Sequence, residues 1–302
     1  MVVAATGFFD GIHLGHRAVL RQLCDLAVDR GLESAVITFW PHPRTVLQQD
    51  ASSLRLLTTL EEKQEMIRSL GVDHLFVVPF TKEFSHLTSE EFMRDYLQHK
   101  FGVGVLLLGY DHRLGSDPVQ TPALLAQKAR QLGLEPVMVQ RTDLDGVGIS
   151  STRIRHLLTE GAVAEANRLL GSPYRLKGVV VAGNRLGRTL GFPTANIQLY
   201  EPLKLLPAHG VYCVEVLFEG KSYAGLCNIG SRPTIGKGNA VTIETHLIDF
   251  QEVIYGRNLE LIFHERIREE RRFDSLDALR ERMTIDLEFA RQYFTFVGSK
   301  QQ

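Results

Sequence analysis

Residues 2–16 read VVAATGFFDGIHLGH. The apolar run Val2–Thr6 predicts a strand, the glycine-rich stretch after it predicts a turn, and apolar residues recur at helical spacing from Leu14. This helix is expected to end at Gly31, because glycine tolerates the left-handed conformation found just after a helix. A strand, a glycine-rich turn and a helix N-terminus in this order present unpaired backbone N–H groups to an anion. The stretch therefore predicts a parallel α/β sheet with a phosphate site at its edge.

The same alternation of short apolar runs with amphipathic segments continues to about residue 150. The apolar runs predict further strands at 35–39, 75–78, 103–108 and 136–139. The amphipathic segments predict helices at 61–70, 90–99 and 122–132. The first of these helices is expected to open with a capping box between Thr58 and Glu61. Strands that alternate with helices predict a doubly wound parallel sheet with helices on both faces.

The alternation ends after Ser150, and two short helical stretches lead to the turn Gly171-Ser172-Pro173. We take this turn as the boundary between two domains, residues 1–172 and 173–302. Beyond it, short strands are predicted at 176–181, 211–218, 223–227, 241–248 and 259–263, with a hairpin turn at Glu219-Gly220. A final helix from about Ser275 to Tyr293 is expected to be capped by Asp274. The second domain is therefore predicted to be an antiparallel β-barrel or sandwich with a terminal helix.

The chain carries almost no net charge, so it has no overall electrostatic attraction for nucleic acid or an anionic membrane. The 302 residues include 34 Lys and Arg and 35 Asp and Glu, which gives a net charge of −1. We expect neither nucleic acid nor a membrane as a partner, so any anion must be held by local geometry.

Cys24, Cys213 and Cys227 show no metal or disulfide spacing, and no signal peptide is expected. These features predict a cytoplasmic protein with reduced thiols, while the oligomeric state stays open.

His13 and His16 are three residues apart at the predicted start of a helix, so their side chains are expected on one face. Both can donate hydrogen bonds to phosphate oxygens, and Gly15 between them leaves room for a nucleotide. A pair of surface or capping histidines is the alternative. The sequence ISSTRIR at 149–155 adds hydroxyls and arginines at another predicted helix start. Beside the histidine pair, it favours a second anion clamp over a simple N-cap.

Two further polar residues follow predicted strands at the carboxyl edge of the sheet, where open α/β sheets bind their ligands. Arg44 comes after the strand that ends at Phe39, and it could reach a phosphate or face the solvent. Asp111 comes after the strand that ends at Leu108, and it could bind a ribose, a base edge or a flavin, or cap a turn. Both residues are candidates for the nucleotide site.

The second predicted domain opens with GNRLGRTLGFPTAN at 183–196, while no Walker phosphate-binding loop occurs in the chain. Glycines beside arginines can still wrap a triphosphate. Thr194 and Asn196 are two residues apart, so on an extended segment their side chains project to the same side. A hydroxyl and a carboxamide placed in this way are oxygen donors of the kind that Mg²⁺ prefers. The alternative is a surface turn whose Thr and Asn bond locally.

The sequence NIGSRPT at 228–234 is a further predicted turn that contains glycine and a cation, Arg232. In the strand that follows, alternation puts Glu244 on the same face as Thr242 and His246. A carboxylate in this position can accept the proton of an alcohol that attacks a phosphate. An exposed strand glutamate without a catalytic role is the alternative.

The motifs at 13–16 and 149–155 together resemble the signature of adenylyl- and cytidylyltransferases. Over its full length the chain resembles the bifunctional prokaryotic riboflavin kinase/FMN adenylyltransferase family, also called FAD synthetase. Five motifs occur in the family's order: 7–16, 149–155, 187–196, 228–234 and the strand around Glu244. The resemblance implies an N-terminal Rossmann-like nucleotidyltransferase domain that adenylylates FMN to FAD and releases pyrophosphate. It also implies a C-terminal riboflavin kinase barrel that phosphorylates riboflavin to FMN with ATP and Mg²⁺.

In the transferase domain, the resemblance implies that the histidines and the second motif handle ATP. The residues expected to take part in catalysis are His13, His16 and Arg155. The residues expected to bind nucleotide or flavin are Gly7, Phe8, Asp10, Gly15, Arg44, Asp111, Ser151 and Thr152. After Asp111 the chain reads HRLGSDP, where the family usually has an aromatic and glycine pattern.

In the kinase domain, the resemblance implies that Glu244 is the base that activates the ribityl hydroxyl of riboflavin. Thr194 and Asn196 are expected to hold Mg²⁺ and ATP. Gly187 and Arg188 are expected to belong to a loop that closes over phosphates. Further binding positions implied by the matching motifs are Gly183, Pro193, Asn228 and Arg232.

Two other interpretations stay open from the residues. One is a riboflavin kinase whose first domain has an inactive or altered site, which the intact His13 and His16 argue against. The other is a non-catalytic protein that only binds a flavin or a nucleotide. Glu244 together with Thr194 and Asn196 argues against this second interpretation, because binding alone needs no base.

Overall fold

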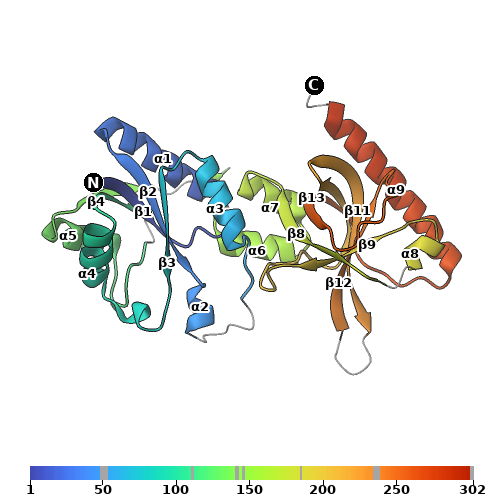
Figure 1. Ribbon diagram of the computed structural model, residues 1–302, viewed down its shortest axis with the longest axis horizontal. Helices are drawn as coiled ribbons and strands as arrows, with labels where there is room; N and C mark the ends of the chain where they lie inside the picture. The colour runs from blue at the N-terminus through green and yellow to red at the C-terminus, as the bar shows by residue number, and fades with distance from the viewer. Residues whose placement is uncertain are drawn as a thin grey trace. The chain divides into compact units, whose positions relative to one another are not determined.

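This computed structural model describes residues 1–47, 54–109, 112–139, 143–144, 147–183, 186–233 and 239–299. The chain divides into two units, Met1–Ser151 and Thr152–Gln302 (Figure 1). The first unit contains a parallel sheet with helices, and the second contains a closed antiparallel barrel followed by a long helix. The fold class expected from the sequence is therefore confirmed in both units.

Five parallel strands form the sheet of the first unit in the order β3-β2-β1-β4-β5. They are β1 (Val2–Thr6), β2 (Glu33–Trp40), β3 (His74–Pro79), β4 (Val103–Gly109) and β5 (Glu135–Val139). The chain runs outward from β1 to β3 on one side and from β4 to β5 on the other. The direction of winding therefore changes between β1 and β4, and the carboxyl ends of these two strands frame the crevice where such sheets bind ligands.

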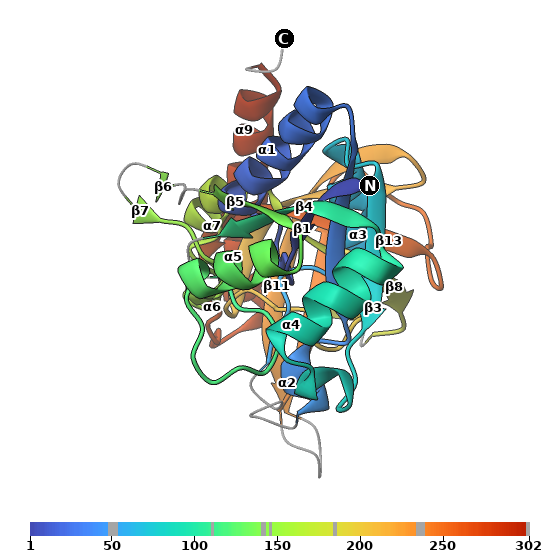
Figure 2. The same ribbon diagram turned by 90° about the vertical axis from the view of Figure 1, so that its left-hand side faces the viewer.

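Helices cover both faces of this sheet (Figure 2). The longer ones are α1 (Leu14–Arg30), α3 (Leu60–Ser69), α4 (Ser89–Glu91) with its continuation η3 (Phe92–Lys100), and α5 (Pro122–Gln131). Side chains alternate along β1, so Val3 and Ala5 pack with α1 and α3, while Val2 and Ala4 pack with η3 and α5. Shorter elements are α2 (Pro43–Val46), η2 (Phe84–His86), β6 (Asp143–Leu144) and β7 (Val147–Gly148).

Two details of these helices differ from the sequence expectation. The capping box of α3 joins Thr59 to Glu62, one residue later than expected, because the hydroxyl of Thr58 is bonded to Gly11 and Asp10. The segment expected as an α-helix at 90–99 is π-helical in η3. The wider turn brings residues five apart onto one face, and it keeps both Phe92 and Leu97 buried.

Six antiparallel strands close the barrel of the second unit in the order β10-β11-β12-β9-β8-β13. They are β8 (Tyr174–Val181), β9 (Ala195–Leu199), β10 (Gly210–Phe218), β11 (Lys221–Pro233), β12 (Asn239–Leu247) and β13 (Asn258–Arg268). The helices are α6 (Ser151–Thr159), α7 (Val163–Leu170), α8 (Leu186–Thr189) and α9 (Leu276–Ser299). The hairpin turn at Glu219-Gly220 is confirmed, since both residues have positive φ angles, 49° and 77°.

The barrel also departs from the sequence expectation in three places. The turn expected at 228–234 is wrong, because residues 228–233 continue β11 and pair with β12 as far as Pro233 opposite Asn239. Strand β9 and the short helix α8 are additional elements. The hydroxyl of Ser275, and not Asp274, caps α9 by accepting a hydrogen bond from the Ala278 N–H at 3.1 Å.

Candidate functional site

The buried carboxylate of Asp10 holds the loop between β1 and α1 through hydrogen bonds to the segment before α3. This carboxylate accepts hydrogen bonds from the N–H groups of Leu57 and Thr58 at 3.1 and 3.0 Å, and from the Thr58 hydroxyl at 3.1 Å. Phe9 and Ile12 on either side of it have φ angles of 49° and 38°, which are unfavourable for residues with side chains. The bonds of Asp10 thus hold the loop in a conformation that it would not adopt alone.

His13 and His16 lie together, as the sequence predicts. The two imidazole rings are stacked with their centroids 3.6 Å apart. His13 is the N-cap of α1, and its Nδ1 accepts the backbone N–H of His16 at 3.2 Å. Since Nδ1 is an acceptor, the proton of the neutral His13 ring is on Nε2. Burial, and then the nearby His13 and Lys63, lower the pKa of His16 well below its usual value.

Small residues and a hydroxyl complete this loop. A Cβ at Gly15 would lie 3.2 Å from the His13 ring, and a Cβ at Gly7 would lie 3.3 Å from the Phe9 ring. The Ser151 hydroxyl donates to the Asp10 carbonyl at 2.9 Å, so the second sequence motif begins against the first. Thr152 and Arg155 follow on the first turns of α6, where Thr152 is exposed and Arg155 is half-buried.

A cavity of about 530 Å³ opens beside this loop. Its polar lining includes Thr6, His16, His112 and Arg113. Its apolar lining is rich in aromatic rings, contributed by Phe8, Phe9, Phe39, Phe80, Phe84 and Phe92. A cavity with this volume and lining suits a planar, partly apolar ligand.

Of the predicted nucleotide contacts that the structure describes, Gly7, Phe8 and His16 line this cavity, and Arg44 does not. Arg44 lies on α2 and is exposed. The preceding His42 packs its ring against Phe8 instead, at a centroid distance of 4.8 Å. Asp111 lies outside the residues that the structure describes.

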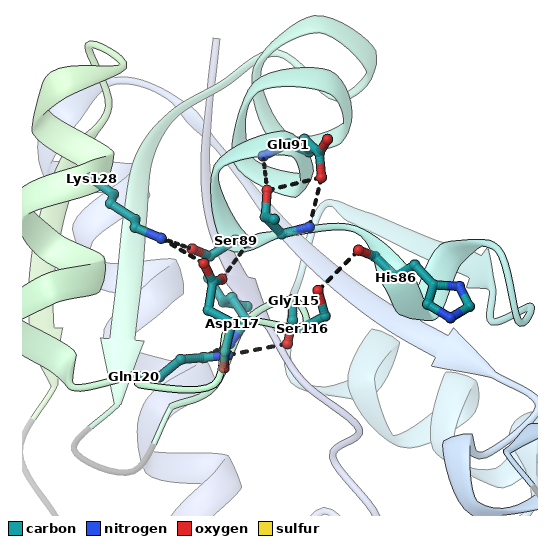
Figure 3. Close-up of polar contacts among 10 residues, drawn as sticks. His86, Ser89, Glu91, Gly115, Ser116, Asp117, Gln120 and Lys128 are labelled. Carbon is teal, nitrogen blue, oxygen red and sulfur yellow. Dashed lines mark hydrogen bonds and ion pairs between the residues drawn. The ribbon is translucent and has the colours of Figure 1, made fainter.

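The segment after β4 is fastened to α4 and α5 by polar contacts (Figure 3). The Asp117 carboxylate accepts the Ser89 N–H at 2.6 Å and a hydrogen bond from Lys128 Nζ at 2.8 Å. Burial alone would raise the pKa of Asp117, but these hydrogen bonds outweigh it and lower the pKa to about 2. A Cβ at Gly115 would overlap with the Ser89 backbone, so the two segments approach as closely as a glycine allows. These contacts fix the segment that supplies Leu114 to the cavity wall.

In the second unit, three neighbouring strands bring Asn196, Glu244 and Asn228 side by side. Glu244 of β12 is paired with Asn228 of β11 and with Asn196 of β9. Directly paired residues of antiparallel strands place their side chains on the same face of the sheet. Glu244 and Asn228 line a cavity of about 290 Å³ together with Thr194. The arrangement places a carboxylate between two carboxamides at a cavity wall.

Two glycines of the predicted phosphate segment lie against the predicted metal ligands. A Cβ at Gly183 would overlap with the Asn196 side chain. A Cβ at Gly187 would overlap with the carbonyl of Phe192 and would lie 3.3 Å from the Thr194 hydroxyl oxygen. Both glycines therefore allow a close approach of backbone to the oxygen donors.

His246 is a functional candidate that the sequence placed on the Glu244 face but gave no role. Its Nδ1 lies 2.8 Å from the Pro193 carbonyl, so Nδ1 carries the proton and donates it. Burial lowers the pKa of His246, which favours the neutral ring. His246 thus holds the segment that leads into Thr194. The alternation of the strand was the signal that could have identified it.

Two arginines that the sequence did not single out line this cavity. The side chains of Arg188 and Arg232 lie outside the described part of the structure. Arg268, the last residue of β13, and Arg271 after it line the cavity. Arg268 Nε forms a 2.8 Å ion pair with Asp286 of α9, whose side chain is buried. Sequence reasoning missed this pair because its members are distant in sequence and meet only through packing of α9.

Known proteins match both halves of the chain. A family model described as FAD synthetase matches residues 1–153, and one described as riboflavin kinase matches residues 170–294. The bifunctional riboflavin kinase/FMN adenylyltransferase of Listeria monocytogenes is 39% identical over 292 residues, which cover 97% of this chain and 92% of that protein. The chain belongs to the bifunctional riboflavin kinase/FMN adenylyltransferase family. The Escherichia coli K12 member is also 39% identical, over 293 residues that cover 97% of this chain and 92% of that one.

A solved structure is similar to this chain over nearly its full length. A crystal structure from Streptococcus pneumoniae, described as a macrolide-efflux protein, matches with a TM-score of 0.88 and 32% identity. It covers 96% of this chain and 94% of the other. Among the described residues of the present chain, no helix has the length and apolar character needed to cross a membrane.

Family membership confirms the two activities expected from the sequence, phosphorylation of riboflavin to FMN and adenylylation of FMN to FAD. Both domains are present, so the comparisons favour the bifunctional enzyme over a monofunctional kinase or a non-catalytic binding protein. The domain boundary expected after Ser172 stays a prediction, because the family models leave residues 154–169 unassigned.

We expect Asp117→Asn to lower the free energy of unfolding of the first unit by about 1 to 3 kcal/mol, because Lys128 and the Ser89 N–H lose a charged acceptor. The stabilisation is full above the ordinary carboxyl pKa near 3.8 and is lost as the pH falls toward about 2. The difference between wild type and variant in urea unfolding should therefore shrink from about pH 7 to about pH 3. Asp95→Asn, which removes an exposed carboxylate, is the control and should change stability by less than about 0.5 kcal/mol. Equal stability of wild type and Asp117→Asn would contradict the role of this contact.

Proposed function

We propose that Glu244 is the general base of riboflavin phosphorylation in the second unit. The observation that carries this proposal is the row of Asn196, Glu244 and Asn228, with Glu244 at the wall of the 290 Å³ cavity. The flanking carboxamides can donate hydrogen bonds to the carboxylate or to a substrate hydroxyl, and they add no charge. A half-buried carboxylate in this setting can accept a proton from a bound alcohol.

The cavity also suits the apolar ring system of riboflavin. Leu279 and Met283 of α9 line it together with Phe192 and Phe273, and Arg271 lies over the Phe273 ring at 4.8 Å. We infer that the isoalloxazine ring packs among these side chains. Its ribityl chain then extends toward Glu244.

The residues beside Glu244 fit a divalent metal ion held with ATP. Thr194 and Asn196 offer a hydroxyl and a carboxamide oxygen, and Gly183 and Gly187 leave space beside them that a Cβ would fill. Uncharged oxygen donors of this kind suit Mg²⁺, so we propose Mg²⁺ as the ion and Thr194 and Asn196 as its protein ligands. When bound with ATP, the ion supplies positive charge to the phosphates. Gly187, Pro193 and the Arg188 and Arg232 positions complete the proposed ATP side.

In the proposed kinase step, the γ-phosphoryl group of ATP is transferred to the terminal hydroxyl of the ribityl chain. Glu244 accepts the proton of the terminal ribityl hydroxyl, and the hydroxyl oxygen forms a bond to the γ-phosphorus of ATP. The bond from the γ-phosphorus to the bridging oxygen breaks, and ADP leaves. His246 holds the Pro193 carbonyl and thereby keeps Thr194 in place beside the reacting groups.

In the first unit we propose that FMN and ATP meet beside His13 and His16. The FMN phosphate is already ionised, so it needs no general base to attack the α-phosphorus of ATP, and pyrophosphate leaves. The Nε2 proton of His13 and the ring of His16 can donate to phosphate oxygens as charge moves during transfer. Ser151 is the proposed contact of this unit to the triphosphate, and Thr152 and Arg155, at the start of the second unit, remain candidate contacts.

The same proposal assigns supporting roles to the rest of the loop. Gly7 and Gly15 permit close approach to the phosphates, and Phe8 contributes to the aromatic wall for the flavin. Asp10 acts through the loop that it holds. Arg44 and Asp111 remain candidate contacts.

We also propose that the enzyme acts in the cytoplasm. Cys24, Cys213 and Cys227 are unpaired. Burial raises the pKa of the Cys213 and Cys227 thiols to about 12, so both are expected to stay reduced and inert there.

The activity itself is tested by incubating the purified chain with riboflavin, ATP and Mg²⁺ and separating the flavins over time. We expect FMN to appear first and then to be converted to FAD. FMN as the sole product would contradict the adenylyltransferase assignment, and the absence of both products would contradict the whole proposal.

Glu244→Gln should bind riboflavin but form FMN at least about 10²-fold more slowly, because the amide cannot accept the hydroxyl proton. Riboflavin binding is measured by fluorescence titration, and FMN formation by chromatography. FAD formation from added FMN should be unchanged, as should both activities of the control Glu165→Gln, which alters an exposed carboxylate on α7. Normal FMN formation by Glu244→Gln would remove Glu244 from the mechanism.

His16→Ala should reduce FAD formation from FMN and ATP by about 10²-fold, because a donor to the transferring phosphate is lost. FMN formation from riboflavin should keep its wild-type rate, since that reaction takes place in the second unit. Equal loss of both activities would contradict the assignment of two separate sites. The rates of both half-reactions in the same protein preparation provide the comparison.

A further inference from the structure

The pairing of β1 with β4 stops before either strand ends, and a histidine spans the gap. The last paired residues are Ala5 and Leu107. Beyond them, the His112 ring lies with Nε2 2.9 Å from the Thr6 hydroxyl oxygen and with Nδ1 3.3 Å from the Gly109 backbone nitrogen. His112 therefore joins the two strands at the point where the winding of the sheet reverses, which is the crevice of the first unit.

The backbone of Gly109 fixes which nitrogen of His112 carries the proton. A backbone N–H can only donate, so Nδ1 of His112 must be the acceptor of this hydrogen bond. The proton of the neutral ring is then on Nε2, and it is donated to the Thr6 hydroxyl oxygen. The Thr6 hydroxyl accepts from the imidazole and keeps its own proton to donate. Within the described residues, this hydroxyl makes no other hydrogen bond.

Thr6 lies at the wall of the ligand cavity and is shielded from bulk water. Thr6 is only 4% exposed, and both Thr6 and His112 line the 530 Å³ cavity. The aromatic part of the same cavity centres on Phe39, whose ring lies 5.5 Å from Phe8 and 5.6 Å from Phe84. The cavity therefore combines an apolar aromatic wall with one oriented hydroxyl donor.

We propose that Thr6, oriented by His112, donates a hydrogen bond to the carbonyl-bearing edge of the flavin ring in the adenylyltransferase site. This inference rests on the proposed function of the first unit. The isoalloxazine ring has an apolar dimethylbenzene end and an opposite end with carbonyl and ring-nitrogen acceptors, which matches the two parts of the cavity. Adenine is smaller and has no apolar end. Thr6 is the contacting residue, and His112 is a positioning residue.

The test begins with two variants of Thr6 in the full-length protein. Thr6→Val keeps the shape but removes the hydroxyl, and it should raise KM for FMN about fivefold, the usual effect of one neutral hydrogen bond. KM for ATP and the rate of riboflavin phosphorylation should be unchanged. Thr6→Ser keeps the hydroxyl and should restore KM for FMN to within about twofold of wild type. Fluorescence titration with FMN in the absence of ATP should show the same order of affinities.

His112 is tested by its coupling to Thr6. His112→Phe removes the hydrogen bonds of the ring to Thr6 and Gly109, so it should raise KM for FMN at least as much as Thr6→Val. If the two side chains act as one unit, adding Thr6→Val to His112→Phe should produce no further increase. Independent effects, with the two increases in KM multiplying, would contradict the positioning role of His112.

The remaining outcomes separate this inference from the proposed function. Failure of the wild-type chain to make FAD from FMN would overturn the proposed function itself. Normal FAD formation by wild type with an unchanged KM for FMN in Thr6→Val would overturn only the present inference. An increase in KM for ATP instead of FMN would place the hydroxyl against the nucleotide, and it would overturn the flavin assignment.

Discussion

The first unit depends on the buried carboxylate of Asp10. By accepting the N–H groups of Leu57 and Thr58, it joins the loop after β1 to the chain that enters α3. These hydrogen bonds hold Phe9 and Ile12 at positive φ angles, and the loop places His13 at the N-cap position just before α1. His13 then serves as the helix cap, which leaves its proton on Nε2. One buried carboxyl group thereby sets the backbone of the loop and, through the helix cap, the tautomer of His13.

In the second unit, the register of three paired strands fixes the position of Glu244 and its neighbours. Glu244 is flanked by Asn228 and Asn196 because β12 pairs with β11 on one side and β9 on the other. A shift of one residue in either pairing would turn a flanking side chain to the other face of the barrel wall. Closure of the barrel fixes this register, and α9 covers the resulting cavity from outside with Leu279 and Met283. The candidate base is therefore placed by backbone hydrogen bonds formed far along the chain.

Local sequence patterns predicted most of the helices and strands. They gave the wrong result where a residue distant in sequence forms a hydrogen bond with the segment. The strands of the parallel sheet, the helix that ends before Gly31 and the turn at Glu219-Gly220 depend on periodicity and on glycine conformation, which are local properties. The capping box moved to Thr59 because Asp10, far away in sequence, engages Thr58. The glycine-containing segment at 228–233 is a strand and not a turn, because β12 pairs with it and forms hydrogen bonds to its backbone.

The sequence by itself determined the two-part fold, the pairing of His13 with His16 and the face on which Glu244 lies, because helical and strand periods set these positions locally. Its five ordered motifs also pointed to the family that the comparisons confirm. Only the tertiary structure decided that Asn228 and Asn196 flank Glu244, that Arg268 meets Asp286, and that His112 orients Thr6. Each of these contacts joins residues from separate elements, so it exists only after packing and strand pairing have brought those elements together.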